Sequence, residues 1–343
     1  MTLFELTRKL IDIPSVTGDE GEVGDFLASY LRVLGYRVEL QTVEGSRCNL
    51  LATSAPPRIV FSTHLDTVPP HISSTEDDEF IFGRGSCDAK GIVAAQIFAA
   101  EKLRARGMEE VGLLFTVDEE LASAGAQVAN AHPLAAECRF LINGEPTDNL
   151  LATGTKGSLR FTIHTTGRAA HSAYPEHGES AIEKLLDVLE SVRRCDWPRD
   201  EMFGDTTCNI GVIAGGTRPN VIAPAAQAEL QIRLATPVAP IKRLLEQAIA
   251  GRARIEYSSE HEPIRLLPVA GLDQCVVRFT TDIPYLSNWG EALLIGPGSI
   301  GDAHTDGERI SKTQLTEAVD LYVRVATTLS SNLERSGKVA TVG

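Results

Sequence analysis

The sequence predicts an α/β protein in which a doubly wound mixed sheet forms the larger domain and a smaller domain is inserted into it. In the first half of the chain, apolar runs of strand length alternate with segments of helical periodicity. From residue 157 the order becomes β-α-β-β-α-β, the ferredoxin-like pattern that forms a small domain by itself. The length of 343 residues, 43% of them apolar, is sufficient for two such domains.

The elements of the first half follow from the spacing of apolar residues. A helix is predicted over residues 20–34, because one of its faces is apolar and Gly35 ends the pattern. That face consists of Val23, Phe26, Leu27, Tyr30, Leu31 and Leu34. Apolar runs then predict strands at 36–43, 58–63, 111–117 and 139–143, with helices at 90–106 and 121–130 between the later strands.

The inserted domain is predicted over residues 157–262. Its expected elements are a strand at 158–166, a helix at 178–194, strands at 208–214 and 226–234, a helix at 238–250 and a strand at 253–258. A strand at Ala292–Ile295 and a helix with Leu315, Val319, Tyr322, Ala326 and Leu329 on one face then follow. We therefore expect a catalytic domain made of residues 1–156 and 263–343, and an insertion that serves as a lid or dimerisation module.

Composition excludes several classes of protein. With 32 Lys+Arg against 46 Asp+Glu, the net charge is −14, which argues against nucleic acid as a partner. No apolar run is long enough to span a membrane and the first residues do not form a secretory signal, so the expected location is the cytoplasm. The six cysteines are scattered without a C-x-x-C pair and are expected to be reduced thiols.

Potential metal ligands follow the predicted strands. His64 and Asp66 come after strand 58–63, Glu119 and Glu120 after strand 111–117, and Glu145 after strand 139–143. A glycine-rich turn after Ala292–Ile295 leads to His304, and Asp88 precedes helix 90–106. Ligands bind at the carboxyl ends of strands in open α/β sheets, so these groups should meet at one edge.

One such residue alone would be an ordinary polar group, but the set together indicates a metal centre. Carboxylates crowded at one edge repel one another unless a cation is present. Two histidines, Asp88, Glu145 and a glutamate of the pair Glu119–Glu120 suit two metal ions that share a bridging carboxylate. Two other kinds of site are rejected, a dinucleotide-binding site and the active site of a serine hydrolase. Gly296–Gly301 satisfies G-x-G-x-x-G, but no helix opens there, and no G-x-S-x-G elbow supports a serine hydrolase built on His304.

Seven motifs carry a resemblance to a known family. They are HLDTVP (64–69), GRGSCDAKG (83–91), DEE (118–120), GEPT (144–147), HSAYP (171–175), RPNVIAP (218–224) and GPGSIGDAH (296–304). In order and spacing they resemble the co-catalytic zinc amidohydrolases, which include acetylornithine deacetylase, succinyl-diaminopimelate desuccinylase, aminoacylases, glutamate carboxypeptidase and several di- and tripeptidases. The similarity extends from about Leu3 to Leu329, and the 296–304 turn looks closest to acetylornithine deacetylases.

The resemblance implies a role for each residue of the metal centre. Asp88 would bridge two divalent ions, zinc first and cobalt or manganese as alternatives, with His64 and Glu145 on one ion and Glu120 and His304 on the other. Asp66 would orient the ring of His64. Glu119 would act as the general base that activates a metal-bridging water, and a cis peptide would follow Asp88.

The inserted domain would supply the substrate contacts. Arg233 lies on the opposite strand face from Leu230, Ile232 and Leu234, and the resemblance implies that it binds the substrate α-carboxylate. His171 and Asn220 match positions that stabilise the oxyanion, and in dimeric relatives this histidine often comes from the other subunit. A homodimer through the inserted domain is therefore expected. A surface salt bridge is the alternative for Arg233.

Three functions are compatible with these residues. The first is hydrolysis of the amide bond of N-acyl amino acids by an acetylornithine deacetylase-like enzyme. The second is a di-zinc exopeptidase that acts on di- or tripeptides. The third, a metal-holding protein without catalysis, is disfavoured because a binder would not need Glu119 in addition to the five ligands. The expected partner is thus a small N-acyl amino acid or short peptide, with no nucleic acid and no membrane.

Overall fold

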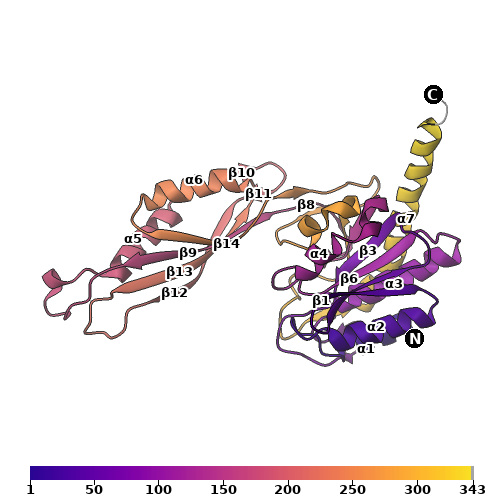
Figure 1. Cartoon of the computed structure of the whole chain (residues 1–343), viewed down its shortest axis with the longest axis horizontal. Coiled ribbons are helices and arrows are strands. Elements are labelled where there is room, and N and C mark those ends of the chain that lie inside the picture. Colours follow the sequence, from indigo (N-terminus) through magenta and orange to yellow (C-terminus); the bar gives the residue numbers. More distant parts are fainter. Residues whose placement is uncertain (341–343) are drawn as a thin grey trace. The chain divides into compact units, whose positions relative to one another are not determined.

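The computed structural model of the chain describes residues 1–340, with side chains through residue 333 (Figure 1). It divides into two units. The larger unit contains Met1–Thr153, Leu266–Cys275 and the chain from Thr281 onward, and the smaller contains Gly154–Arg265 and Val276–Thr280. The sequence had suggested 157–262 for the insertion and had assigned Val276–Thr280 to the larger domain.

A mixed sheet forms the framework of the larger unit, which confirms the predicted fold class. Its strand order is β1-β2-β6-β3-β7-β17-β8-β15, with β16 paired to β8. The strands are β1 (Arg37–Glu44), β2 (Arg47–Thr53), β3 (Ile59–His64), β6 (Val111–Thr116), β7 (Phe140–Asn143), β8 (Leu151–Thr155), β15 (Ile264–Arg265), β16 (Gln274–Val277) and β17 (Glu291–Leu294). The neighbours β6, β3, β7 and β17 run parallel, so their carboxyl ends lie at the same edge of the sheet.

Helices cover both faces of this sheet. Ile59 and Phe61 of β3 share a core with α1 (Leu3–Ile11), α2 (Gly21–Val33), α3 (Lys90–Ala105) and α7 (Lys312–Ala340). Val60 of the same strand faces the other way, into a second core with α4 (Ala124–Ala129) and the short helices η1 (Pro133–Glu137), η3 (Ile283–Tyr285) and η4 (Ser287–Trp289). Alternate residues of one strand thus enter two apolar layers, as a doubly wound sheet requires.

A three-stranded antiparallel sheet adjoins the segments of the larger unit that carry Asp88 and His304. Its order is β18-β5-β4, formed by β18 (Arg309–Ser311), β5 (Phe80–Phe82) and β4 (Thr75–Glu76). The chain leaves β5 toward Asp88 and enters β18 from His304. Within residues 1–340, no helix has both the length and the apolar character needed to cross a membrane.

The smaller unit has the β-α-β-β-α-β order of a ferredoxin-like fold. Its elements are β9 (Gly157–Thr166), α5 (Ala181–Arg193), β12 (Thr207–Gly215), β13 (Ala225–Leu234), α6 (Val238–Ile249) and β14 (Arg254–His261), with η2 (Pro175–His177) and the hairpin β10 (Arg199–Asp200) and β11 (Gly204–Asp205) as additions. The sheet order is β12-β13-β9-β14 and all pairs are antiparallel. Both helices pack on the face that carries Leu159, Phe161 and Ile232, which leaves the other face polar.

Candidate active site

The topology of the larger unit brings the ligand-type side chains to one edge. His64 is the last residue of β3, Glu119 and Glu120 follow β6, and Glu145 follows β7. Because these strands are adjacent and parallel, residues far apart in the sequence become neighbours. Asp88 precedes α3, and the Asp88–Ala89 peptide is cis, as expected from the resemblance.

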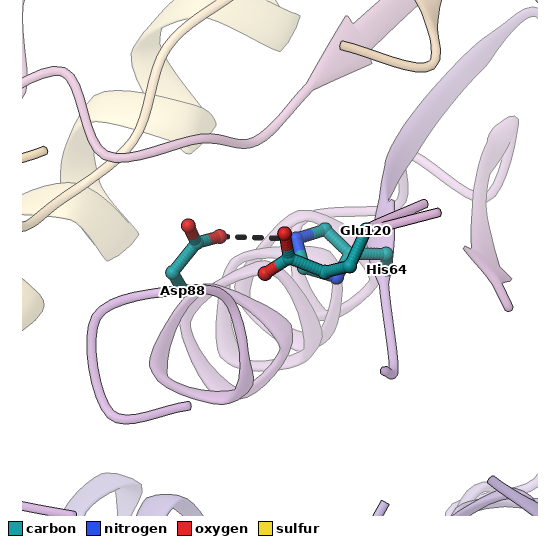
Figure 2. A group of neighbouring side chains, drawn as sticks. All are labelled: His64, Asp88 and Glu120. Atoms are coloured by element: carbon teal, nitrogen blue, oxygen red, sulfur yellow. Dashed lines mark hydrogen bonds and ion pairs between the residues drawn. The ribbon is translucent and has the colours of Figure 1, made fainter. Parts of the chain in front are cut away.

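Four side chains meet at this edge. His64 Nε2 lies 3.0 Å from Asp88 Oδ1, and Figure 2 shows these two side chains beside Glu120. One ligand atom from each of the three lies within 4.8 Å of the others. His304 joins them: its Nε2 is 2.8 Å from Glu120 Oε1 and 3.4 Å from Asp88 Oδ2. The site therefore contains imidazole and carboxylate groups at the mutual distances that a shared cation can bridge.

The two imidazoles are surrounded by negative charge. Burial alone would lower the pKa of His64, but Asp66 and Asp88 outweigh burial and hold it well above the usual value. Hydrogen bonds to Asp88 and Glu120 raise the pKa of His304 to about 10. The His64 Nδ1 lies 2.9 Å from the backbone oxygen of Asp66 and 3.5 Å from its carboxylate. This contact fixes the ring so that Nε2 faces Asp88.

Asp66 also fixes the turn after β6. Its Oδ1 accepts a hydrogen bond from the backbone N–H of Glu119, its Oδ2 accepts one from that of Glu120, both at 3.1 Å, and Thr17 donates to Oδ2 at 2.9 Å. The carboxylate of Asp66 is thus satisfied by the protein. It can orient the residues of this turn without binding a ligand itself.

Glu145 and Glu119 are the least compensated acidic groups of the site. Glu145 is buried, and its Oε1 has no hydrogen-bond partner among the described residues. Burial and the charge of Asp88 raise its pKa well above the usual value. Glu119 is partly exposed, but its removal from bulk water and the charge of Glu145 raise its pKa as well. Buried carboxylates without donors are unfavourable. A divalent cation would supply the missing compensation, so these residues fit a metal centre.

Sequence reasoning missed several charged residues near this edge, two of which are Asp282 and Arg47. Asp282 is buried, accepts a hydrogen bond from Thr116 Oγ1 at 2.7 Å, and has a pKa raised to about 6 by burial. Arg47 in β2 pairs with Asp118, directly before Glu119. Both lie outside recognised motifs. The only sequence signal for Arg47 was a charged residue inside a stretch long enough to form a strand. No sequence signal pointed to Asp282.

The remaining predicted site residues belong to the smaller unit. His171 and Asn220 lie close together, because His171 forms a bridge with Val221 and the N–H of Ser172 donates to the oxygen of Asn220 at 3.1 Å. An open pocket of about 630 Å³ adjoins them, lined in part by Ser172 and Val221. Both His171 and Asn220 are exposed.

Arg233 lies on β13, opposite in direction to the buried Ile232 and Leu234. It is partly buried, and no ion pair involves it among the described side chains. Burial and the nearby Arg160 lower its pKa. The surface salt bridge that the sequence left open for Arg233 is therefore not present among the described side chains. Its guanidinium is available to bind an anionic ligand.

Comparisons with known proteins show which family the chain resembles. The model of peptidase family M20/M25/M40 matches residues 60–328. A probable carboxypeptidase of Emericella nidulans is 38% identical, with the alignment covering 94% of this chain and 88% of the relative. The crystal structure of a tripeptidase from Staphylococcus aureus superposes with a TM-score of 0.78 at 20% identity, over 94% of this chain and 96% of the other. A dinuclear metal-binding peptidase of the M20 family from Bacillus subtilis gives 0.68 at 16% identity, over 94% and 97%.

Proposed function

The chain belongs to peptidase family M20/M25/M40, and we propose that it hydrolyses the amide bond of N-acyl amino acids, as acetylornithine deacetylase does. Membership makes it a metal-dependent hydrolase. The observation that carries the proposal is the position of Glu119, a carboxylate on the same turn as Glu120 and beside the group formed by His64, Asp88 and Glu120. An acid placed there can exchange a proton with a reacting molecule.

Two divalent ions, zinc in the first instance, would be held by His64, Asp88, Glu120, Glu145 and His304. When bound, they would polarise the scissile carbonyl and make the attacking water more acidic. The dinuclear peptidase of Bacillus subtilis supports the number of ions. The unpartnered Oε1 of Glu145 and the close approach of two imidazoles to Asp88 support the assignment of ligands.

Glu119 would take a proton from the attacking water and deliver it to the leaving amine. The backbone N–H groups of Glu119 and Glu120 both donate hydrogen bonds to Asp66, so Asp66 fixes the turn from which both side chains extend. His171 and Asn220 would stabilise the oxyanion, and Arg233 would bind the carboxylate of the amino acid in a bidentate manner. The absence of a competing ion pair at Arg233 among the described residues supports this last role.

A second candidate function is an exopeptidase acting on di- or tripeptides. The names of the relatives favour it, because one is a probable carboxypeptidase and another a tripeptidase. A carboxypeptidase and a deacylase both release an amino acid with a free carboxylate, so Arg233 would serve either reaction. They differ in whether the substrate must be a peptide.

We also propose a homodimer through the smaller unit. The strand β12 lies at one edge of its sheet and exposes Val212 and Ile213, which are 50% and 56% accessible. Leu186 on α5 is exposed as well, at 49%. An apolar edge strand is a liability in a monomer and a natural pairing surface for a second copy.

The function is tested with a substrate panel. Protein freed of metal is loaded with zinc, cobalt or manganese and given N-acetyl and N-succinyl amino acids beside di- and tripeptides, with Glu119→Ala as the background control. We expect metal-dependent release of a free amino acid from the N-acyl substrates. Faster turnover of peptides would favour the exopeptidase, and an N-blocked peptide would show whether a free amine is required. Turnover of neither class would contradict both.

A further inference from the structure

The segments that carry Asp88 and His304 are joined by one buried side chain, that of Glu308. The two segments begin at the same antiparallel pair, in which Arg309 of β18 lies opposite Phe82 of β5. Residues 83–88 lead away from β5, and residues 304–308 lead into β18. Glu308 is therefore the first residue beyond the β-ladder on one side, as Gly83 is on the other.

Glu308 contacts nearly every residue of the facing segment. Its Oε1 accepts hydrogen bonds from the backbone N–H groups of Gly85 at 2.9 Å and of Cys87 and Asp88 at 3.1 Å. Its Oε2 lies 2.6 Å from Nη1 of Arg84. Its backbone oxygen accepts from the N–H of Gly83 at 3.0 Å. The side chains of Glu308 and Arg84 are 0% and 2% exposed, so these contacts are shielded from bulk solvent.

Three N–H groups that meet at one oxygen form an anion nest. A carboxylate at this depth is stable only because four donors compensate its charge. The nest in turn needs an unusual backbone: Gly85 has φ 86°, and a Cβ there would lie 2.9 Å from Cγ2 of Thr67. The conformation of residues 83–88 and the charge of Glu308 are thus mutually dependent.

We propose that Glu308 is a positioning residue that holds Asp88 and His304 in the relative geometry needed to share a metal ion, and so sets the metal affinity of the protein. The inference rests on the proposed metal site. Glu308 is not itself a proposed ligand, but it accepts a hydrogen bond from the N–H of Asp88 and lies four residues after His304. Partners of this kind typically contribute a factor of about 10 to 100 to metal affinity.

The test measures zinc binding by metal-free protein in competition with a chromophoric chelator. Glu308→Gln keeps the size of the side chain and one acceptor oxygen, but its amide places a donor against either Arg84 or the backbone N–H groups. Glu308→Asp keeps the charge but is shorter by one methylene, about 1.5 Å. We expect both variants to bind zinc about 10- to 100-fold more weakly than the parent. The visible absorption of the cobalt-loaded variants should also change, because it reports the arrangement of the ligands.

A control separates positioning from general loss of stability. Leu31 of α2 is fully buried in the apolar core and is not a site residue. Leu31→Ala should lower the unfolding midpoint while leaving zinc affinity and the cobalt spectrum unchanged. Should both Glu308 variants fail to fold, Arg84→Lys replaces them, since among the contacts of Glu308 it alters only that of Oε2; it also removes the hydrogen bond from Arg84 Nε to the oxygen of Pro70. We expect its zinc affinity to fall about threefold to tenfold.

The variant Asp88→Ala shows whether a negative result contradicts the positioning role of Glu308 or the proposed metal site itself. If Asp88→Ala loses zinc but the Glu308 variants, or Arg84→Lys in their place, bind like the parent, the positioning role is overturned and the metal site stands. If Asp88→Ala binds zinc like the parent, the proposed metal site is wrong and the role of Glu308 falls with it.

Discussion

Arg47 and Asp118 form an ion pair directly before the two glutamates of the site, with 2.6 Å between Nη2 and Oδ1. Asp118 has φ 72°, a conformation that residues other than glycine seldom adopt. Its backbone oxygen accepts hydrogen bonds from Ala122 and Ser123, and its Oδ2 accepts from the N–H of Ala124. Arg47 also binds Glu20 through Nε and Nη2 at 2.7 and 2.8 Å. The guanidinium therefore anchors the turn that presents Glu119 and Glu120.

Arg47→Met should be strongly destabilising. It leaves Glu20 and Asp118, which are 0% and 5% exposed, without a counter-charge, and the loss of one partner of a buried pair costs about 3–5 kcal/mol. Urea unfolding measures the change in the free energy of unfolding. We also expect kcat to fall, because Arg47 no longer anchors the turn that carries Glu119 and Glu120. The exposed Lys102–Asp320 pair is the control, since Lys102→Met should change stability by less than ~1 kcal/mol. Equal effects of the two substitutions would contradict an anchoring role for Arg47.

Glu119→Ala should abolish turnover, by a factor of about 100 or more, while the metal content stays near that of the parent. The physical reason is that the base exchanges a proton but donates no ligand. Elemental analysis of the purified variant, beside Asp88→Ala as a ligand control, provides the measurement. Loss of most of the metal from Glu119→Ala would mean that Glu119 and a ligand have been interchanged.

Glu145→Gln should have opposite effects on stability with and without metal. In metal-free protein the substitution replaces a buried carboxylate whose Oε1 has no partner among the described residues, so the free energy of unfolding should rise by about 1–2 kcal/mol. With zinc bound, the variant lacks a ligand, and the stabilisation by metal that it loses should exceed its gain in the metal-free state, so its free energy of unfolding should fall below that of the parent. Urea unfolding with zinc or with chelator measures both, and the exposed Glu291→Gln serves as the control. The same sign in both conditions would argue against Glu145 as a ligand.

Arg233→Lys should raise KM by about tenfold with a smaller effect on kcat. A lysine cannot reproduce a bidentate grip on a carboxylate, and one charge-assisted hydrogen bond is worth about 1.5–3 kcal/mol. Steady-state kinetics on the preferred substrate test this, with the exposed Arg254→Lys on β14 as the matched control. Unchanged kinetics for both Arg233→Lys and Arg233→Ala would remove Arg233 from the substrate site.

His171→Ala should lower kcat by about 100-fold to 1000-fold with little change in KM or in metal content, because the oxyanion forms only during the reaction. Mixing this variant with Glu119→Ala tests where the histidine comes from. If His171 acts across a dimer, a hybrid has one site with both defects and one with neither, so activity returns. If it acts within its own chain, every hybrid site has one defect and no activity returns. Full activity of His171→Ala alone would exclude the role.

The sequence was sufficient to predict that His64, Asp88 and Glu120 meet at one edge, because each lies at or soon after the end of a buried strand or before a helix. It was not sufficient to predict Arg47 and Glu308. Their partners are distant in the sequence, Asp118 by 71 residues and Asp88 by 220, and such a pair leaves no periodic pattern. Only the folded chain shows that Arg47 contacts the turn before Glu119 and that Glu308 contacts the segment that carries Asp88.

Several elements of the larger unit were also missed, among them the helix α1 and the strand β2. Helix α1 is short, but Thr2 and Glu5 form a capping box that is readable in the sequence as T-x-x-E. Strand β2 was not predicted, because the polar Asn49 interrupts its apolar run. That side chain is fully buried, where it donates to the oxygen of Gly125 and accepts from the N–H of Val117. A polar residue satisfied by tertiary contacts interrupts the apolar run on which strand prediction depends.

The parallel order of β6, β3, β7 and β17 has a consequence for the biosynthesis of the protein. His64 and His304 are 304 − 64 = 240 residues apart, and the whole smaller unit is synthesised between them. A nascent chain that ends before β17 contains most of the proposed ligands but neither His304 nor the strand that precedes it. The complete site is assembled only after the last part of the larger unit joins the sheet. Tight metal uptake should therefore mark the end of folding, and incomplete chains should compete poorly for the ion.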